Sequence, residues 1–469
     1  MSLEWNVATI GELCSNVSSG GTPKSTNEKY YGGDIPWLNT KEINFNRIYD
    51  TEKHITKEGY ENSAAKWIKK DSVIVAMYGA TAAKVAMNMV DLTTNQACCN
   101  LTIDKSLANP KYVYYYLYSN YERLLNLASG AAQQNLNSNI IKEFPINIPS
   151  LNVQNEVVTL LSTIDDKIEL NQKINNHLEE IILEIFDRWF VKFELSDELK
   201  SSKLGLIPKG WDIDYLGSKK SCTIMGSGIR NFEDSKIYIA TADVDNSIIT
   251  YNENLITMED KPSRANMQPV PKSIWFAKMI DSRKLIMVDE YSSELLDNYI
   301  FSTGFCGLKC VDKYFYYLWT FLLTDAFNTM KNNFCTGTTM QAINNKDTKL
   351  IEFVLPDDNL LSQFNSIAEP IFKEIYYNNN EIKKLQNLRD ILLPKLMSGE
   401  IDVSKINCDL KKLIRKFILI ILNYLWRHLY ENKNYFKNTK SNETILKSRP
   451  IYKINKLFIK FIRRCRYSR

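Results

Sequence analysis

Side chains suited to hydrogen bonding with base edges gather in the turn-rich segments of this chain. Asn and Gln can make bidentate contacts to adenine, and Lys or Arg can do so to guanine. The candidates in the first half of the chain are Thr22, Lys24, Asn39, Lys41, Tyr78, Thr81, Gln133 and Gln134. Those in the second half are Arg230, Arg264, Asn266, Lys278, Arg283, Lys284, Thr338 and Gln341. Ordinary solvated loops have a similar composition, so these residues alone leave base recognition and simple surface exposure as alternatives.

Motifs for catalysis are missing from the sequence. It contains no phosphate-binding GxxxxGK[ST] loop, and Gly226-Ser227-Gly228 lacks the third glycine of a dinucleotide site. No Asn/Asp-Pro-Pro-aromatic motif for holding a target base is present either. The three histidines are isolated, and Cys306 and Cys310 have no histidine near them in sequence, which argues against a zinc site. The acidic pair Asp357-Asp358 follows Pro356 and is better explained as a turn. We therefore expect a binding protein that is not an enzyme by itself, with no catalytic residue and no metal.

The charge is divided unevenly along the 469 residues. The formal net charge is +5, but residues 409–469 hold 17 Lys+Arg against 3 Asp+Glu, a balance of +14. Residues 1–408 therefore carry −9, which argues against a protein that coats nucleic acid without specificity. The nine cysteines form no CxxC pair. Scattered thiols, no signal peptide and no apolar run of about 18 residues favour a cytoplasmic protein.

The sequence repeats itself 207 residues further on. Gly130-Ala131-Ala132-Gln133-Gln134-Asn135-Leu136-Asn137 reappears as Gly337-Thr338-Thr339-Met340-Gln341-Ala342-Ile343-Asn344. The start of the chain matches at an offset of 206, with Trp5 facing Trp211 and Gly11 facing Gly217. A repeat of this length indicates a duplicated domain rather than an array of short repeats.

Each copy has a globular part followed by a segment with helical periodicity. Buried strands are expected at residues 35–38 and 72–77, loops at 19–24 and 31–34, and a helix at 110–127. The apolar positions expected to pair the long helices are Ile164, Ile168, Leu178, Ile185, Ile371, Ile375, Leu385 and Leu392. The first helix covers residues 152–190 and would be about 58 Å long. Pro370 is expected to kink or delay the second.

The two helices are expected to pair antiparallel as a coiled coil, because each alone would expose an apolar stripe. Asn171 and Asn378 are equivalent in the repeat and interrupt the two stripes. We expect them to meet and to fix the register; the alternative is that both face solvent.

The expected fold is mixed α/β, with two homologous globular domains related by a pseudo-two-fold axis. The expected boundaries are 1–150 for the first domain and 151–197 for the central helical spacer. The second domain covers 198–358, the distal helical spacer 359–403, and a basic extension 404–469.

Over residues 1 to about 403 the chain resembles the specificity subunits of type I restriction–modification systems. The resemblance rests on Gly21-Thr22-Pro23 with Ile35-Pro36-Trp37, on Asn95-Gln96-Ala97, and on the 130–136 segment leading to Pro149. It continues through Gln154, Phe186-Asp187-Arg188-Trp189-Phe190 and Gly205-Leu206-Ile207-Pro208-Lys209-Gly210-Trp211. The most specific string is Leu388-Arg389-Asp390-Ile391-Leu392-Leu393-Pro394-Lys395-Leu396-Met397-Ser398-Gly399-Glu400-Ile401.

The resemblance implies a DNA-recognition subunit in which each half recognises one part of a bipartite double-stranded site. It implies docking of modification (methyltransferase) subunits, which carry S-adenosylmethionine and methylate adenine N6, and of a restriction/translocase subunit that uses ATP and Mg. This chain would bind no cofactor and would not contact a membrane. The alternative is a coiled-coil scaffold with duplicated ligand-binding domains and no DNA role, which the acidic body favours.

The basic extension departs from the family, whose members end near residue 403. Three hypotheses remain open for it: a fortuitous extension, an arm that contacts DNA or RNA, and an interfacial amphipathic helix around residues 417–430.

Overall fold

The computed structural model describes residues 5–128, 135–250, 254–338 and 340–403. Gln133, Gln134 and the extension 404–469 lie outside the described residues. The chain divides into two compact units, of which the first contains residues up to Thr159 and from Leu393 onward. The second runs from Leu160 to Leu392 and so includes most of both long helices, which the sequence boundaries had set apart as spacers.

The globular part of the first unit is built on mixed sheets. One has the strand order β2-β10-β7-β8-β4, with bounds Cys14–Ser19, Cys98–Ile103, Val73–Ala76, Val85–Asn88 and Asn46–Ile48. Another has the order β5-β3-β9-β6, with bounds Lys53–Ile55, Tyr31–Leu38, Leu92–Thr94 and Trp67–Ile68. Strand β1 (Asn6–Thr9) pairs antiparallel with β11 (Pro145–Ile148), so the two ends of this part meet. The mixed α/β class expected from the sequence is confirmed.

Two local expectations for the first unit were wrong. Residues 31–34, expected as a loop, begin β3, and a register shift between Tyr31 and Ile35 accommodates Gly32 at φ +80°. The single helix expected at 110–127 is split into α2 (Pro110–Ser119) and α3 (Tyr121–Leu125). The break is at Asn120, whose Nδ2 donates to the carbonyl oxygen of Tyr116 (2.9 Å) and so competes with the helical ladder.

The second unit repeats this topology, except that its first sheet has no strand in the place of β4. Its first sheet has the order β15-β24-β21-β22, with bounds Cys222–Ile224, Phe305–Cys310, Ser273–Ala277 and Leu285–Val288. The other has the order β19-β16-β23-β20, with bounds Leu255–Ile256, Lys236–Ile239, Tyr299–Ser302 and Ala265–Met267. Strand β14 (Asp212–Tyr215) pairs with β25 (Glu352–Leu355) as β1 does with β11. The central pairs β3–β9 and β16–β23 are both parallel, so the duplication extends from sequence to sheet order.

Shorter elements fill the connections. They include α1 (Lys57–Glu61), α4 (Ser138–Glu143), α6 (Ser293–Asn298), α7 (Phe315–Leu323), α8 (Asp325–Asn333), α9 (Asn345–Thr348), β17 (Val244–Asp245) and β18 (Ile248–Ile249). Residues 191–210, expected as a linker, contain the hairpin of β12 (Leu199–Ser202) and β13 (Gly205–Pro208). Gly205 turns the hairpin at φ +93°, a conformation that side chains with a Cβ disfavour.

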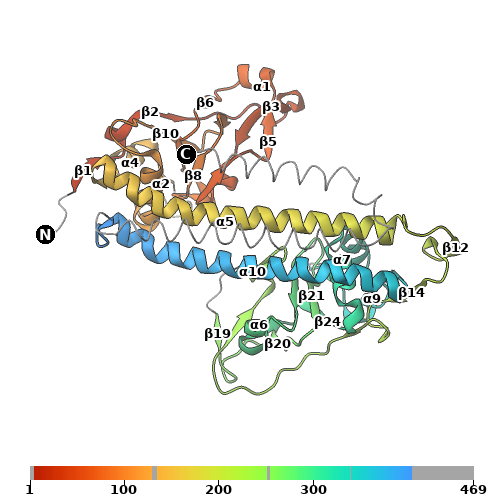
Figure 1. The fold of residues 1–469 in the computed structure, drawn as a ribbon. Helices are drawn as coiled ribbons and strands as arrows, with labels where there is room; N and C mark the ends of the chain where they lie inside the picture. The colour runs from red at the N-terminus through yellow and green to blue at the C-terminus, as the bar shows by residue number, and fades with distance from the viewer. Residues whose placement is uncertain (1–4, 129–134, 251–253, 339, 404–469) are drawn as a thin grey trace, which may run out of the picture. The chain divides into compact units, whose positions relative to one another are not determined.

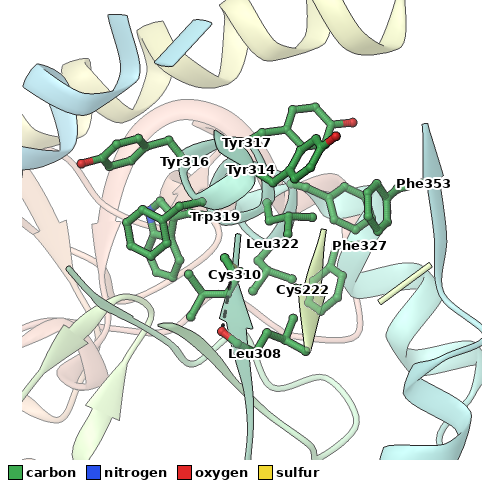
Figure 2. Close-up of a cluster of buried hydrophobic side chains, with 14 of the residues drawn as sticks. Cys222, Leu308, Cys310, Tyr314, Tyr316, Tyr317, Trp319, Leu322, Phe327 and Phe353 are labelled. Carbon is green, nitrogen blue, oxygen red and sulfur yellow. Dashed lines mark hydrogen bonds between the residues drawn. The ribbon is translucent and has the colours of Figure 1, made fainter. Parts of the chain in front are cut away.

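An aromatic core supports the second unit's sheet from one side. Figure 2 shows Tyr316, Tyr317, Trp319 and Leu322 of α7 gathered with the β24 residue Leu308 and its neighbours. The hydroxyl of Tyr317 is satisfied by donation to the carbonyl oxygen of Val354 (2.6 Å). Because α7 packs on β21 and β22, this core fixes the strands from which the hairpin loop described below projects.

The long helices are α5 (Leu151–Phe186), which continues as a π-helical turn at Asp187–Val191, and α10 (Asp358–Met397). The expectation that Pro370 delays the second helix was wrong, because α10 begins twelve residues earlier and continues through it. Its start is fixed by Asp357, whose Oδ1 accepts from the backbone N–H groups of Asn359 and Leu360 (both 3.0 Å). The acidic pair at 357–358 is therefore a helix cap.

Within the second unit, α5 and α10 lie side by side and antiparallel (Figure 1). Arg389 Nη1 donates to Asp165 (3.2 Å), and about three turns further along α5, Asn378 Nδ2 donates to Asn175 (2.9 Å). The apolar contact is made by Ile164, Ile168 and Ile382, with Leu385 and Leu392 packed against them. Ile185, Ile371 and Ile375 pack instead against the aromatic core of the globular part, and Leu178 is half-buried.

Asn171 and Asn378 are both buried in this helix pair, but the hydrogen bonds join them to other residues. Asn171 Nδ2 donates to Glu381 (2.7 Å), and Asn378 donates to Asn175. The expected hydrogen bond between the two asparagines is therefore not formed. The antiparallel register is centred near Lys173 and Asn380, two residues beyond Asn171 and Asn378. Each asparagine consequently faces a side chain about one helical turn from its equivalent.

Candidate nucleic-acid interface

In the second unit, the predicted basic residues converge on the loop between β21 and β22, residues 278–284, here called the β21–β22 loop. Ala277 N–H donates to the carbonyl oxygen of Lys284 (2.9 Å) and closes its base. Lys278 Nζ donates to the carbonyl oxygen of Thr303 (3.2 Å), and Lys284 Nζ to that of Thr241 (2.7 Å). Arg283 is exposed and forms an ion pair with Asp325, which is also exposed. Both lysines are thus held by backbone carbonyls, and Arg283 carries the freest cationic group in this loop.

The repeated segment at 337–344 lies directly against the β21–β22 loop. Met279 and Ala342 form an antiparallel bridge, and Ile280 N–H donates to the carbonyl oxygen of Gln341 (3.0 Å). The chain returns through Ile343 N–H, which donates to the carbonyl oxygen of Lys278 (3.0 Å). These bonds place the exposed Thr338 and Gln341 on the segment that borders the loop.

A turn at residues 303–304 connects the loop with Arg264 and Asn266. Thr303 N–H donates to the carbonyl oxygen of Arg264 (2.9 Å), and Lys278 N–H donates to that of Gly304 (3.0 Å). Gly228 N–H donates to the carbonyl oxygen of Asn266 (2.8 Å), which brings the segment that carries Arg230 alongside. The structure therefore brings the predicted residues of the second half into one continuous region, with the side chains of Arg230 and Arg264 exposed.

The first unit builds the same arrangement. Leu136 N–H donates to the carbonyl oxygen of Met77 (2.8 Å), as Ile343 N–H does to that of Lys278. Tyr78 forms an antiparallel bridge with Asn135, as Met279 does with Ala342. Tyr78 (41% exposed) and the half-buried Thr81 lie in the loop between β7 and β8. Met77 N–H donates to the carbonyl oxygen of Ala97 (2.8 Å), the counterpart of the bond to Gly304. The two loops are thus equivalent in position although their sequences differ.

The remaining predicted residues of the first unit surround the turn at 95–97. Thr22 Oγ1 hydrogen-bonds Gln96 Oε1, and Lys24 is exposed two residues later. A Cβ at Gly20 would lie 1.9 Å from the carbonyl oxygen of Thr94, so this close approach requires glycine. Asn95 N–H donates to the carbonyl oxygen of Leu38 (3.0 Å), which brings the next two predicted residues to the same turn.

Asn39 and Lys41 differ in what they offer to a ligand. Asn39 Oδ1 accepts from the backbone N–H of Lys41 (3.1 Å), and Glu42 completes a capping box by accepting from the N–H of Asn39 (2.9 Å). Local capping occupies the acceptor of Asn39. The side chain of Lys41 is exposed.

Lys84 was missed in the sequence analysis. It closes the β7–β8 loop as Lys284 closes the other, and its Nζ donates to Asn44 Oδ1 (2.8 Å) beside the ring of Phe45. The equivalence was hidden because the offset here is 200 residues, whereas the recurring strings keep 207. A comparison of the two buried strands, each followed by a short loop and a lysine, would have found it.

The recurring asparagine of the repeat has a structural role. Asn137 Oδ1 accepts from the N–H groups of Asn139 and Ile140 (2.9 and 3.0 Å), and Asn344 Oδ1 caps α9 in the same way (2.8 and 2.9 Å). Helix capping therefore explains why this position recurs in both copies.

Cys306 and Cys310 lie in the core rather than in this region. Burial raises the pKa of Cys306 to about 12 and that of Cys310 well above its ordinary value, so both remain thiols. Within the described ranges, no group of three or more His, Cys, Asp or Glu side chains is arranged to hold a metal ion. Among the same residues, no helix is both long and apolar enough to cross a bilayer.

Comparison with known proteins shows what this chain is similar to. Residues 2–180 match the model of the "Type I restriction modification DNA specificity domain". The MjaIX specificity subunit of Methanocaldococcus jannaschii is 28% identical over 86% of this chain and 95% of that protein. This chain is similar to the specificity subunits of type I restriction–modification systems. This similarity does not favour the scaffold alternative.

Other similar proteins are also described as specificity (S) subunits. The HindI specificity subunit of Haemophilus influenzae is 21% identical over 85% of this chain and 100% of its own length. A crystal structure of an S subunit from M. genitalium gives a TM-score of 0.49 at 17% identity, over 84% of this chain and 96% of that one. The contacts of individual residues with DNA stay predictions.

Proposed function

We propose that this chain recognises a bipartite DNA site, with one half of the site bound by each globular part. The observation that carries the proposal is the twofold occurrence of one loop arrangement, at Met77 with Leu136 and at Lys278 with Ile343. The loops are equivalent in position but differ in side chains, which supports recognition of two different half-sites. Direct recognition would come from side chains of these loops inserted into the major groove.

The helix pair is proposed to set the spacing between the two half-sites. Its support is the antiparallel register within the second unit, held by a polar group at Asn175 and Asn378 and by the Arg389–Asp165 ion pair. A polar contact inside an apolar helix pair specifies one register, because a shifted register would leave it unsatisfied.

Catalysis is assigned to partner subunits. Modification subunits would carry S-adenosylmethionine and methylate adenine N6, and a restriction subunit would use ATP and Mg; this chain would bind none of these and would be non-catalytic. A docking surface for the modification subunit is offered by Leu388 (45% exposed) and Ile391 (60% exposed), one turn apart on α10. Apolar side chains exposed together on a helix indicate a protein contact. We place the assembly in the cytoplasm.

Sequencing of methylated adenines in cells with and without this gene tests the proposal. We expect one bipartite motif to lose methylation when the gene is deleted and to regain it when the gene is restored. Complementation with a chain in which Arg230 and Arg264 are both changed to Ala is the matched comparison, because these exposed cations belong to the proposed interface of the second unit alone. An unchanged methylome after deletion would contradict the proposed function.

A further inference from the structure

A buried lysine is hydrogen-bonded to the backbone of the β21–β22 loop. Lys331 of α8 is 1% exposed, and its Nζ reaches two carbonyl oxygens of the loop, those of Met279 (3.1 Å) and Ser282 (2.5 Å). Lysine is almost never fully buried unless its ammonium group has partners. Those partners are the main chain of the loop that carries Lys278, Arg283 and Lys284.

Neighbouring side chains of α8 hold the same loop from the same direction. Asn332 Oδ1 accepts from the backbone N–H of Asp281 (3.1 Å), and its Nδ2 donates to the carboxylate of Asp281 (2.7 Å). Asp281 needs such support because its φ is +54°, a conformation that is uncommon for residues other than glycine. The Arg283–Asp325 ion pair adds a contact at the first turn of α8.

We propose that Lys331 is a positioning residue for DNA recognition: its ammonium group, bonded to the carbonyl oxygens of Met279 and Ser282, holds the β21–β22 loop in the conformation that presents Lys278, Arg283 and Lys284 to the DNA. The inference rests on the proposed function of the loop. A loop ordered before binding loses less conformational entropy on the DNA, so affinity and sequence discrimination both increase.

Among the described residues of the first unit, no lysine is bonded to the β7–β8 loop in this way. The position equivalent to Lys331 in the 207-residue repeat is Leu124, which is fully buried. The corresponding loop of the first unit instead forms a 3₁₀ turn at Gly79–Thr81. The two hydrogen bonds from Lys331 to the loop, here called the lysine clamp, therefore concern recognition by the second unit alone. Loss of the clamp should reduce sequence discrimination at one half of a bipartite site.

The charge state of Lys331 gives the clamp a measurable property. Burial lowers the pKa of its ammonium group to about 8; the thiol of Cys335 and the carboxylate of Asp281 act in the opposite direction, and the guanidinium of Arg283 adds to the lowering. Charge-assisted hydrogen bonds are about twice as strong as neutral ones. Deprotonation of Lys331 above pH 8 would therefore weaken its hydrogen bonds to the loop.

The test is made on the full chain assembled with its modification subunits, on duplexes with one half-site or the other altered. Lys331→Met removes the ammonium group at similar volume, and Thr329→Ala changes an exposed residue of the same helix as the matched control. We expect Lys331→Met to lose roughly tenfold in discrimination at one half-site, with the other unchanged. Wild-type discrimination at that half-site should fall between pH 7 and pH 9, and that of Lys331→Met should not.

Each outcome is decisive. Equal loss at both half-sites, or no loss at either, would overturn the clamp, as would identical pH profiles for the wild type and Lys331→Met. If Lys331→Met does not fold, Asn332→Ala is used instead, because it removes the two hydrogen bonds to Asp281. It should give a smaller loss of discrimination at the same half-site, and no loss there would overturn the proposal. Absence of any sequence-specific binding by the wild-type assembly would instead refute the proposed function.

Discussion

At the scale of single residues, the second unit depends on a buried ion pair between Lys272 and Asp289. Asp289 is 1% exposed and accepts from Lys272 Nζ (2.7 Å) and from the hydroxyl of Tyr316 (2.6 Å). Burial, together with the adjacent carboxylate, raises the pKa of Tyr316, so this phenol stays a donor. The pair ties β22 to the start of β21, the two strands whose connecting loop belongs to the proposed interface.

Asp289→Ala should lower the free energy of unfolding of the second unit by about 3–5 kcal/mol, because it leaves a buried ammonium group without its partner. Asp212→Ala breaks an ion pair with Lys220 whose side chains are 64% and 54% exposed, and should cost less than about 1 kcal/mol. Urea denaturation followed by tryptophan fluorescence measures both. Equal losses would show that burial of the Lys272–Asp289 pair does not set its contribution.

The sequence predicted which residue types occur in the proposed interface. It predicted less well which of these side chains are free to bind. Asn39 and Thr22 were selected for their hydrogen-bonding groups, yet Asn39 caps a turn and Thr22 bonds Gln96. Amide and hydroxyl groups satisfy local backbone as readily as they contact bases, so the sequence does not separate the two uses. Lys331 was not selected at all, because a lone lysine in a helical segment is ordinarily a solvated one.

At the scale of elements, the helices were the most predictable part. Apolar residues at spacings of three and four located α5 and α10, and Gly399 at φ +76° follows the end of α10 as a helix-terminating glycine should. Pro370 was misjudged because the buried side chains of Phe364, Ala368 and Phe372 hold the helix on both sides of it. Their packing offsets a cost of about 3 kcal/mol for an interior proline.

The register of α5 against α10 can be measured by double-mutant cycles. Asn175 and Asn378 are hydrogen-bonded, so their alanine substitutions should show a coupling free energy of about 0.5–1.5 kcal/mol. Asn171 and Asn378 make no direct hydrogen bond with each other among the described contacts, and their coupling should be smaller. A larger coupling for Asn171 with Asn378 would restore the register in which the equivalent asparagines meet.

At the scale of the whole molecule, duplication was visible in sequence only where structure constrains it. The strings that kept the 207-residue offset form a helix cap at Asn137 and Asn344 and the segments next to the loops. The order of the strands that both units have is also conserved, but strands β16 and β3 keep almost no common sequence, because packing constrains the size and apolarity of side chains more than their identity. The loops diverge most, which is the expected result of recognising different half-sites.

The proposed spacing role predicts the effect of lengthening the helix pair. Four residues inserted into both α5 and α10, near Lys173 and Asn380, add about one helical turn, roughly 5.4 Å. At about 3.4 Å per base pair, the nonspecific spacer of the methylated motif should lengthen by one or two base pairs while both half-sites stay the same. Sequencing of methylated adenines measures the spacer directly.

Two controls separate spacing from general disruption. Insertion into α5 alone shifts the polar contacts of Asn171 and Asn175 out of register, so specific methylation should be lost rather than displaced. The same four residues placed in the turn of the β12–β13 hairpin, between Ser202 and Gly205, lie outside the helix pair and should leave the motif unchanged. If the double insertion methylates the original motif, the helices do not set the spacing, and the distance between half-sites must be fixed by the partner subunits instead.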